Sequence, residues 1–316
     1  MSVLRETAVR RLLPSSALCR VGCNWRVLAN SAVSDEVLLQ LWRFHSPIGG
    51  RMRHLRHVVG AAVALTTAGT VLATPAVAVP AAENYAALGD SYASGVGTRD
   101  YFEDSGDCLR SPKAYAQLWA DSHDVASFAF EACSGAVTDD VNSGQLDKLS
   151  ADTTLVTISI GGNDAGFSSV IKDCLLGDDA RCDSAVSKGE DRARNELPDK
   201  LDTTYANIRE AAPNAKVVVL GYPRLNELGD CGIPFFSDAK RQRINDGADV
   251  LAEVLSGRAE AAGFTFADTR DAFAGHGVCS SDAWINGPSS PLVESFHPDA
   301  DGHAKAYLPV LNDITG

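Results

Sequence analysis

The sequence is short of positive charge. Its 28 lysine and arginine residues are outnumbered by 41 aspartate and glutamate residues, so the formal net charge is −13. Nine of the basic residues and three of the acidic ones lie in residues 1–78, which leaves 19 basic and 38 acidic residues in 79–316. Binding to nucleic acid needs a basic surface opposite the phosphates, and docking on anionic lipid needs basic clusters. The acidic composition of residues 79–316 argues against both partners.

The sequence also has no long hydrophobic run. Its most apolar segment, Val58 to Ala73, is too short and too rich in alanine, threonine and glycine for a membrane anchor. A basic stretch at 52–57 precedes it, and Ala76-Val77-Ala78 follows as an Ala-x-Ala cleavage site. This order predicts a signal peptide over residues 52–78, cleavage near Ala78, and a secreted protein without stable membrane insertion.

Residues 1–51 lie upstream of this predicted signal peptide. A signal peptide begins at the N-terminus of its chain, so we expect translation to start at Met52 and residues 1–51 to be wrongly assigned coding sequence. The alternative is an extended leader. In both cases the folded domain is expected to span residues 79–316.

Patterns that bind metals or dinucleotides are incomplete. Cys19-x-x-x-Cys23 lacks further cysteine or histidine at ligand spacing, which argues against a zinc site. Gly95-Val96-Gly97 lacks the third glycine of a dinucleotide-binding loop, because residue 100 is aspartate. Ser237-Asp238-Ala239-Lys240 matches the S-x-x-K motif of penicillin-binding proteins, but the companion motifs are missing and the segment is typical of a helix start. We expect no metal and no other cofactor.

Six of the eight cysteines lie in residues 79–316. An even set of six in an exported chain predicts three disulfides, for which fifteen connectivities are possible. The six are Cys108, Cys133, Cys174, Cys182, Cys231 and Cys279.

Strand and helix patterns alternate along the predicted domain. Short apolar or β-branched runs predict strands at 85–88, 127–130, 155–160, 216–220 and 264–267. Apolar positions at helical spacing predict helices at about 113–122, 191–212, 238–262 and 300–310. This alternation predicts an α/β fold with three α/β/α layers and a central, mostly parallel sheet.

Polar, glycine-rich turns follow three of the predicted strands. Gly89-Asp90-Ser91 follows the first, Cys133-Ser134-Gly135 the second and Gly161-Gly162-Asn163-Asp164 the third. The active site of an open parallel sheet forms at the carboxyl edge of its strands. We therefore expect these three turns to converge.

Together with Ser295-Phe296-His297-Pro298 near the C-terminus, these turns resemble the SGNH (GDSL) hydrolase family in both motif and order. The resemblance covers about residues 84–316 and is greatest for the secreted actinobacterial lipase/esterase branch. It implies a flavodoxin-like fold, a cofactor-free serine hydrolase acting on a small-molecule or lipid ester, and disulfides paired in sequence order, 108–133, 174–182 and 231–279. We expect the protein to be a monomer.

The resemblance assigns roles to four residues. Ser91 is the expected nucleophile, and His297 is the expected base, titrating near the ordinary histidine pKa of about 6.5. The Ser91 N–H, the Gly135 N–H and the Asn163 side-chain amide are the expected oxyanion-hole donors. The plainer alternatives are a helix-capping serine and a turn asparagine. Asp90 and Asp164 are interpreted as structural residues that bind loop amides.

The third triad member is the open point. The family often places aspartate three residues before the histidine, and here that position holds Glu294, which is one methylene longer. Either Glu294 is the orienting acid, or a backbone carbonyl just before His297 takes that role.

Three functions remain as hypotheses. We favour a secreted esterase or lipase that forms an acyl-enzyme at Ser91. The alternatives are a carbohydrate acetyl esterase and, in a different class, a non-catalytic secreted module that binds lipid or glycan.

Overall fold

The computed structural model describes residues 82–316. The predicted leader, the signal peptide, its cleavage site and the cysteines at 19 and 23 all lie outside the described residues. Within residues 82–316 no helix combines the length and the apolar character needed to span a membrane.

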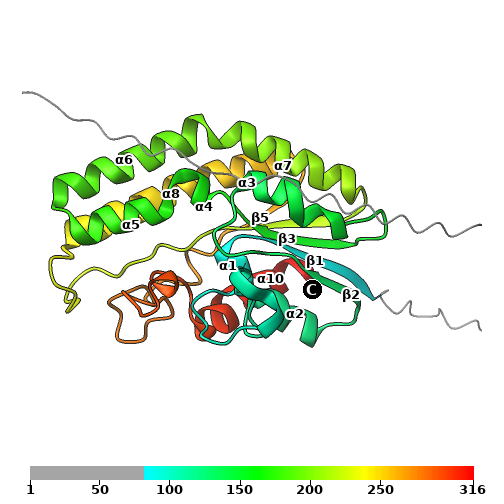
Figure 1. Ribbon diagram of the computed structural model, residues 1–316, viewed down its shortest axis with the longest axis horizontal. Coiled ribbons are helices and arrows are strands. Elements are labelled where there is room, and N and C mark those ends of the chain that lie inside the picture. Colours follow the sequence, from blue (N-terminus) through cyan, green and yellow to red (C-terminus); the bar gives the residue numbers. More distant parts are fainter. Residues whose placement is uncertain (1–81) are drawn as a thin grey trace, which may run out of the picture. The chain divides into compact units, whose positions relative to one another are not determined.

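A five-stranded, fully parallel sheet forms the centre of the fold (Figure 1). The strand order is β2-β1-β3-β4-β5, and every residue of β3 is buried, as the run of β-branched residues predicts. The strands are β1 (Glu83–Gly89), β2 (Val125–Phe130), β3 (Leu155–Ser159), β4 (Lys216–Leu220) and β5 (Thr265–Ala267).

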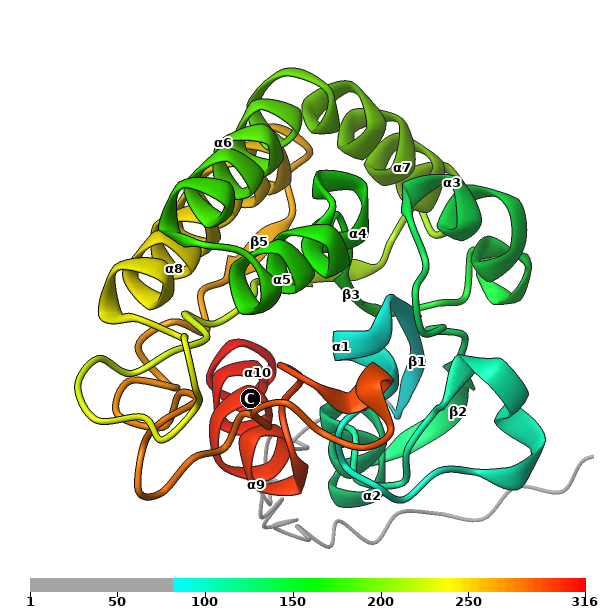
Figure 2. The ribbon, with the colours of Figure 1, turned by 60° about the vertical axis from the view of Figure 1, so that its left-hand side comes forward.

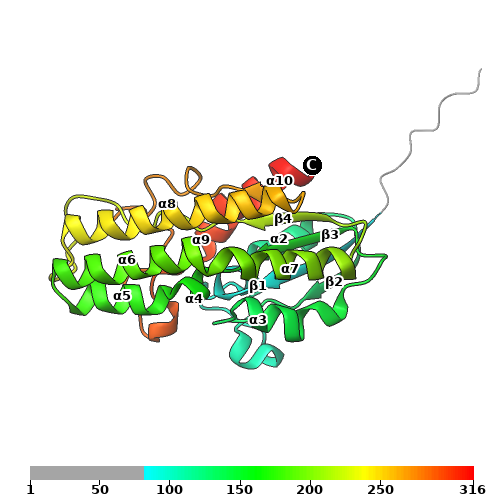
Figure 3. The same ribbon diagram turned by 90° about the horizontal axis from the view of Figure 1, so that it is seen from above.

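Helices cover both faces of the sheet, which confirms the three-layer α/β/α fold (Figures 1 and 3). One layer holds α2 (Tyr115–Ser122) and the C-terminal helical segment, in which α9 (Ala300–Gly302) and α10 (Leu308–Thr315) flank a π-helical turn. The other holds α3 (Thr138–Asp140), α7 (Leu197–Ala211) and α8 (Asp238–Ala261).

Besides short helical turns, the structure contains two longer helices that were not expected from the sequence, α5 (Phe167–Leu176) and α6 (Asp179–Asn195). The single helix predicted at 191–212 is also wrong, because α6 ends at Asn195 and α7 begins at Leu197 with Pro198 in its first turn. The buried face of α6 contains mostly small residues, since it packs against α5 and α8 rather than the sheet. A helix that buries small residues leaves only a weak apolar pattern.

The chain reverses its direction of travel across the sheet at β1. From β1 the chain continues to β2, which lies on one side of β1, whereas from β3 it continues to β4, on the opposite side. The loops that follow the neighbouring strands β1 and β3 therefore diverge and leave an opening between them. The short helices α1 (Ser91–Ser94) and α4 (Gly162–Ala165) begin on the two sides of this opening. Helices α5, α6 and α8 extend beyond the same edge of the sheet (Figure 3) and lie beside one another (Figure 2).

Three disulfides join the loops around this edge. They are the pairs implied by the family resemblance, Cys108–Cys133, Cys174–Cys182 and Cys231–Cys279. Cys174–Cys182 joins α5 to α6, and Cys231–Cys279 joins the loop before α8 to the segment after β5.

We expect the disulfides to contribute unequally to stability. Cys231–Cys279 closes a sequence separation of 48 residues and Cys174–Cys182 one of 8. In the chain-entropy model the longer loop stabilises the folded state by about 1–2 kcal/mol more. Urea unfolding of the Cys→Ser pair variants measures this difference, and non-reducing peptide mapping checks the pairing. Equal losses in the free energy of unfolding on removal of either bridge, or a free thiol among the six cysteines, would contradict this expectation.

Candidate active site

The turn after β1 is fixed by sterics and by a side-chain clamp. Gly89 has φ +123°, and a Cβ there would lie 2.2 Å from the Ser159 carbonyl oxygen, so only glycine fits. The Gln145 amide accepts from the Gly89 N–H at 2.7 Å and donates to its carbonyl at 2.9 Å. Asp90 then caps α1 by accepting from the Tyr92 N–H. Ser91 is thereby held as the first residue of α1.

His297 is hydrogen-bonded to Ser91. Its Nε2 lies 2.7 Å from Ser91 Oγ, and its Nδ1 lies 2.9 Å from the Ser295 carbonyl oxygen. Because a carbonyl oxygen can only accept, Nδ1 carries the ring hydrogen and Nε2 is left as the acceptor for the Ser91 hydroxyl. This is the geometry of an activated serine, and both residues are at least nine-tenths buried.

The segment that carries His297 is held by groups the sequence analysis did not identify. Tyr92 donates its hydroxyl hydrogen to the Phe296 carbonyl at 2.6 Å. The Asn286 side chain donates to the carbonyls of Gly97 and His297 at 2.9 and 3.1 Å. Phe296 is fully buried with φ +60°, a strained backbone that its surroundings must hold in place. The only sequence signal for Tyr92 was its place beside Ser91.

The side chain of Glu294 contacts residues other than His297. Its buried side chain accepts from the Tyr101 hydroxyl at 2.8 Å and pairs with the Arg99 guanidinium at 3.3 Å. The hydrogen bond to His297 Nδ1 comes instead from the Ser295 backbone. Of the two alternatives for the third triad member, these contacts favour the backbone carbonyl of Ser295 over Glu294, and the assignment stays a prediction.

The expected oxyanion-hole residues come from adjacent loops. Asn163 donates its side-chain amide to the Ala136 carbonyl at 2.9 Å, which ties α4 to the turn that contains Gly135. Among the described residues, the backbone N–H groups of Ser91 and Gly135 donate to no protein atom. Donors that point at no protein partner remain free for a developing oxyanion. Their role as the oxyanion hole stays a prediction.

The two interpreted aspartates bind loop groups, as expected. Asp164 accepts from the Thr138 N–H and hydroxyl at 3.0 and 2.8 Å and pairs with Lys200 at 3.1 Å. Asp90 accepts from the Tyr222 hydroxyl at 2.5 Å, and that hydroxyl in turn accepts from the Gly162 N–H at 3.1 Å. Tyr222 thus connects the turn after β1 to the turn after β3. Sequence reasoning missed it, although it follows β4 at the same sheet edge.

Burial shifts the pKa values of the two central ionisable groups in opposite directions. Loss of solvation lowers the pKa of His297 to about 4, although the hydrogen bond with Ser295 acts in the opposite direction. Loss of solvation raises the pKa of Asp90 to about 7, against hydrogen bonds from Tyr222 and Tyr92 that lower it. His297 is therefore neutral, and able to accept a proton, throughout the neutral pH range.

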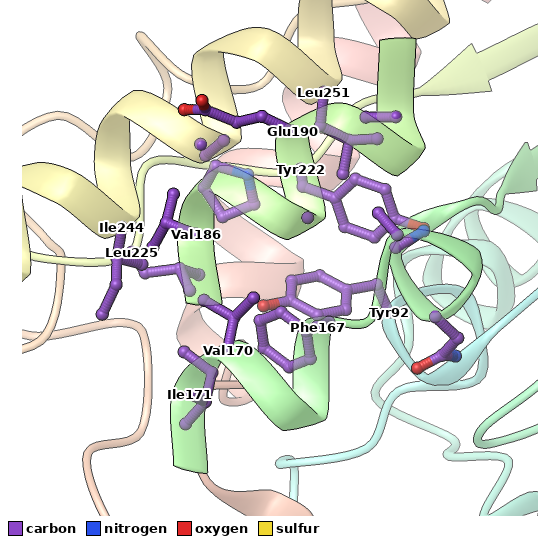
Figure 4. Close-up of a pocket in the computed structure, with 18 of the residues that line it drawn as sticks. Tyr92, Phe167, Val170, Ile171, Val186, Glu190, Tyr222, Leu225, Ile244 and Leu251 are labelled. Atoms are coloured by element: carbon purple, nitrogen blue, oxygen red, sulfur yellow. The ribbon is translucent and has the colours of Figure 1, made fainter. Parts of the chain in front are cut away.

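A pocket with a cavity volume of about 80 Å³ opens beside Ser91. Its lining runs from Ser91 and Asn163 along α5, α6 and α8 and is mostly apolar (Figure 4). Within residues 82–316 no cluster of histidine, cysteine or acidic side chains is arranged to hold a metal ion.

Comparison with known proteins gives consistent matches. Residues 87–305 match the model of the GDSL-like Lipase/Acylhydrolase family. The chain is 49% identical to Lipase 1 of Streptomyces coelicolor over 257 residues, covering 81% of this chain and 94% of that protein. It is 44% identical to a lipase of Streptomyces rimosus over 268 residues, covering 84% of this chain and all of that protein. These matches confirm the family resemblance seen in the sequence.

Two solved structures share the fold at 46% identity and a TM-score of 0.72 each. One is described as an extracellular lipase from Streptomyces rimosus, and the match covers 74% of this chain and 100% of the lipase chain. The other is described as phospholipase A1 from Streptomyces albidoflavus, and the match covers 74% of this chain and 99% of the phospholipase chain.

We expect the acid limb of the pH–rate profile to lie near pH 4 rather than near 6.5. A lowered pKa keeps His297 neutral to lower pH, so the fall in kcat/KM that comes from His297 should lie near pH 4. The measurement uses a soluble ester with brief exposure to acid. Asp90→Asn is the control, because it removes the carboxyl group whose pKa is raised to about 7. A limb centred near 6.5 in both proteins would contradict the burial argument.

We expect Glu294→Gln to lower kcat by less than about 30-fold, because the ring tautomer depends on the Ser295 carbonyl; losing a true triad acid costs about 10⁴. Steady-state kinetics with circular dichroism as a check of folding measure the effect. A loss of a thousandfold or more in a folded variant would make Glu294 the orienting acid after all.

Proposed function

The chain belongs to the GDSL-like Lipase/Acylhydrolase family, and we propose that it is a secreted enzyme that cleaves lipid esters with Ser91 as nucleophile and His297 as base. Carboxylic ester hydrolysis is the activity of the family. The observation that supports the residue assignment is the 2.7 Å contact between His297 Nε2 and Ser91 Oγ, with Nδ1 occupied by the Ser295 carbonyl.

The proposed reaction runs through an acyl-enzyme. Ser91 Oγ attacks the ester carbonyl carbon while His297 Nε2 takes the hydroxyl proton. The tetrahedral oxyanion receives hydrogen bonds from the Ser91 and Gly135 N–H groups and the Asn163 amide. The bond to the alcohol then breaks, and His297 returns the proton to the leaving oxygen. In the second half, His297 Nε2 takes a proton from water while the water oxygen attacks the acyl carbon. The bond to Ser91 Oγ then breaks, and His297 returns the proton to Oγ as the carboxylic acid leaves.

The apolar lining of the pocket favours a lipid ester over an acetylated glycan. Sugars are recognised through hydroxyl groups and need polar partners, whereas the residues beyond Asn163 include Phe167, Val170, Ile171 and Leu251. The similar solved structure of phospholipase A1 from Streptomyces albidoflavus supports the same substrate class.

Export is the proposed location. Three disulfides are typical of an oxidising compartment, and one similar solved structure is described as extracellular. The proposal includes a signal peptide at 52–78, with the segment 1–51 upstream of it. The catalytic domain at 79–316 is proposed to be a monomer that binds no nucleic acid.

We expect Ser91→Ala to lower kcat by at least three orders of magnitude and to abolish labelling by a fluorescent alkylphosphonate, because the nucleophile is lost. Ser237→Ala is the matched control: this serine caps α8 and belongs to the S-x-x-K sequence that competes for the role of nucleophile. Active-site titration and steady-state kinetics measure both variants. If the Ser91→Ala variant kept more than a tenth of the wild-type kcat, Ser91 would not be the nucleophile. If the wild-type protein neither reacted with the phosphonate nor hydrolysed esters, it would be a binding module.

A further inference from the structure

We propose that the pocket beside Ser91 is a groove for one extended acyl chain of about eight carbons, built by matching faces of three helices. This inference rests on the proposed function, because it takes Ser91 as the reacting group. It adds the chain length, the side of the ester that enters the groove and the residues that set both.

Helix α8 forms one wall. Its lining residues, Ile244, Gly247, Ala248 and Leu251, fall at positions i, i+3, i+4 and i+7, so they lie on one face over two helical turns.

Helix α6 forms the second wall with the same spacing, at Val186, Gly189, Glu190 and Ala193. Glu190 contributes its aliphatic stem, because its carboxylate is bound to the Arg243 guanidinium at 2.5 and 3.0 Å. Figure 4 shows this carboxylate directed toward α8 and away from the space enclosed by the apolar side chains. The wall that a ligand meets is therefore apolar.

Helix α5 closes the third side with Phe167, Val170 and Ile171. Figure 4 places Tyr92 and Phe167 at one end of the pocket and Ile171 and Ile244 at the other. Ser91 adjoins Tyr92, so the chain would run from the nucleophile toward Ile171 and Ile244.

The length of the groove follows from helix geometry. Seven residues separate the first and last lining positions on both α6 and α8, which corresponds to about 10 Å at about 1.5 Å per residue. An extended hydrocarbon advances by about 1.3 Å per carbon, because carbon–carbon bonds of about 1.5 Å are inclined to the chain axis. The lined stretch therefore holds about eight carbons.

The width of the groove is set by glycines. A Cβ at Gly247 would lie 2.9 Å from Val186 Cγ1, across the interface between α8 and α6. A Cβ at Gly189 would lie 3.3 Å from the Ala165 carbonyl oxygen and 3.4 Å from Val170 Cγ2. Helix α6 is thus as close to α8 and to α5 as glycine allows, so an added methyl group at either position must displace a lining side chain.

The reaction geometry decides which part of the ester occupies the groove. His297 Nε2 must return its proton to the leaving alcohol, so the alcohol departs past His297. Ser91 and Asn163 line the pocket, but His297 does not, and the rings of Tyr92 and Phe167 stand against it at centroid distances of 5.0 and 5.9 Å. The acyl chain therefore enters the groove and the alcohol stays outside it.

Two ester series test this assignment, both kept below the concentration at which the substrates aggregate. One is p-nitrophenyl esters from acetyl to palmitoyl, in which only the acyl part changes. The other is acetates of alcohols from ethanol to octanol, followed by acid release, in which only the alcohol changes. We expect kcat/KM in the acyl series to rise by up to about fourfold per methylene as far as octanoyl and then to level off, as expected for burial of successive methylenes. The alcohol series should stay nearly flat.

Variants on α8 give a matched comparison. Gly247→Ala pushes a methyl group toward Val186, whereas Gly257→Ala, on the same helix, has nothing within 4 Å of the added Cβ. We expect the octanoyl-to-acetyl ratio of kcat/KM to fall about threefold in Gly247→Ala and to keep its wild-type value in Gly257→Ala. Ala248→Phe, at a half-buried lining position, should lower the ratio by more than about tenfold, since it blocks several methylene positions. Circular dichroism and thermal unfolding verify that each variant is folded.

The outcomes separate this inference from the proposed function. A maximum at acetyl, a rise that continues unchanged to palmitoyl, or an Ala248→Phe effect confined to the alcohol series would overturn the acyl groove while Ser91 remains the nucleophile. Turnover that survives Ser91→Ala would overturn the proposed function and this inference with it.

Discussion

The hydrogen bond from His297 Nδ1 to the Ser295 carbonyl leaves Nε2 as the ring atom that can accept the Ser91 proton. A backbone acceptor has a fixed position only if the backbone is fixed. Tyr92 and Asn286 bind the carbonyls of Phe296 and His297 and hold Phe296 in a strained conformation. A carboxylate is not needed for this orientation, which allows Glu294 to hold the Arg99–Tyr101 loop instead.

The rest of the site is joined to that bond through the sheet edge. Gly89 lets β1 turn directly over Ser159 of β3, and Tyr222 at the end of β4 binds both Asp90 and the Gly162 N–H. Three strands therefore place the nucleophile turn and the α4 turn relative to one another. The same dense packing withholds water from His297 and Asp90 and moves their pKa values in opposite directions.

Local patterns predicted the parts of the fold that depend on local chemistry. The β-branched run at 155–160 carries its own signal, and so the sheet could be anticipated. The Ser91–His297 pairing was anticipated through the family resemblance of the motifs and their order. Helix α6 could not, because it buries mostly small residues against α5 and α8. The contacts of Tyr222, Asn286 and Gln145 were also out of reach, since each joins segments distant in the sequence. Glu294 showed the limit of motif reasoning: the right spacing did not place its carboxylate beside the histidine.

Helices α5, α6 and α8 project beyond the sheet edge, while the reacting groups stand on the loops that end β1 and lead to the C-terminus. On the proposed roles, bond breaking and substrate selection belong to separate parts of one domain. Substitutions in α5, α6 and α8 can then alter which esters are accepted without disturbing proton transfer. The Cys174–Cys182 bridge keeps α5 and α6 together while such substitutions accumulate. Such a division lets the range of substrates diversify under selection, or be redesigned in the laboratory, on an unchanged catalytic base.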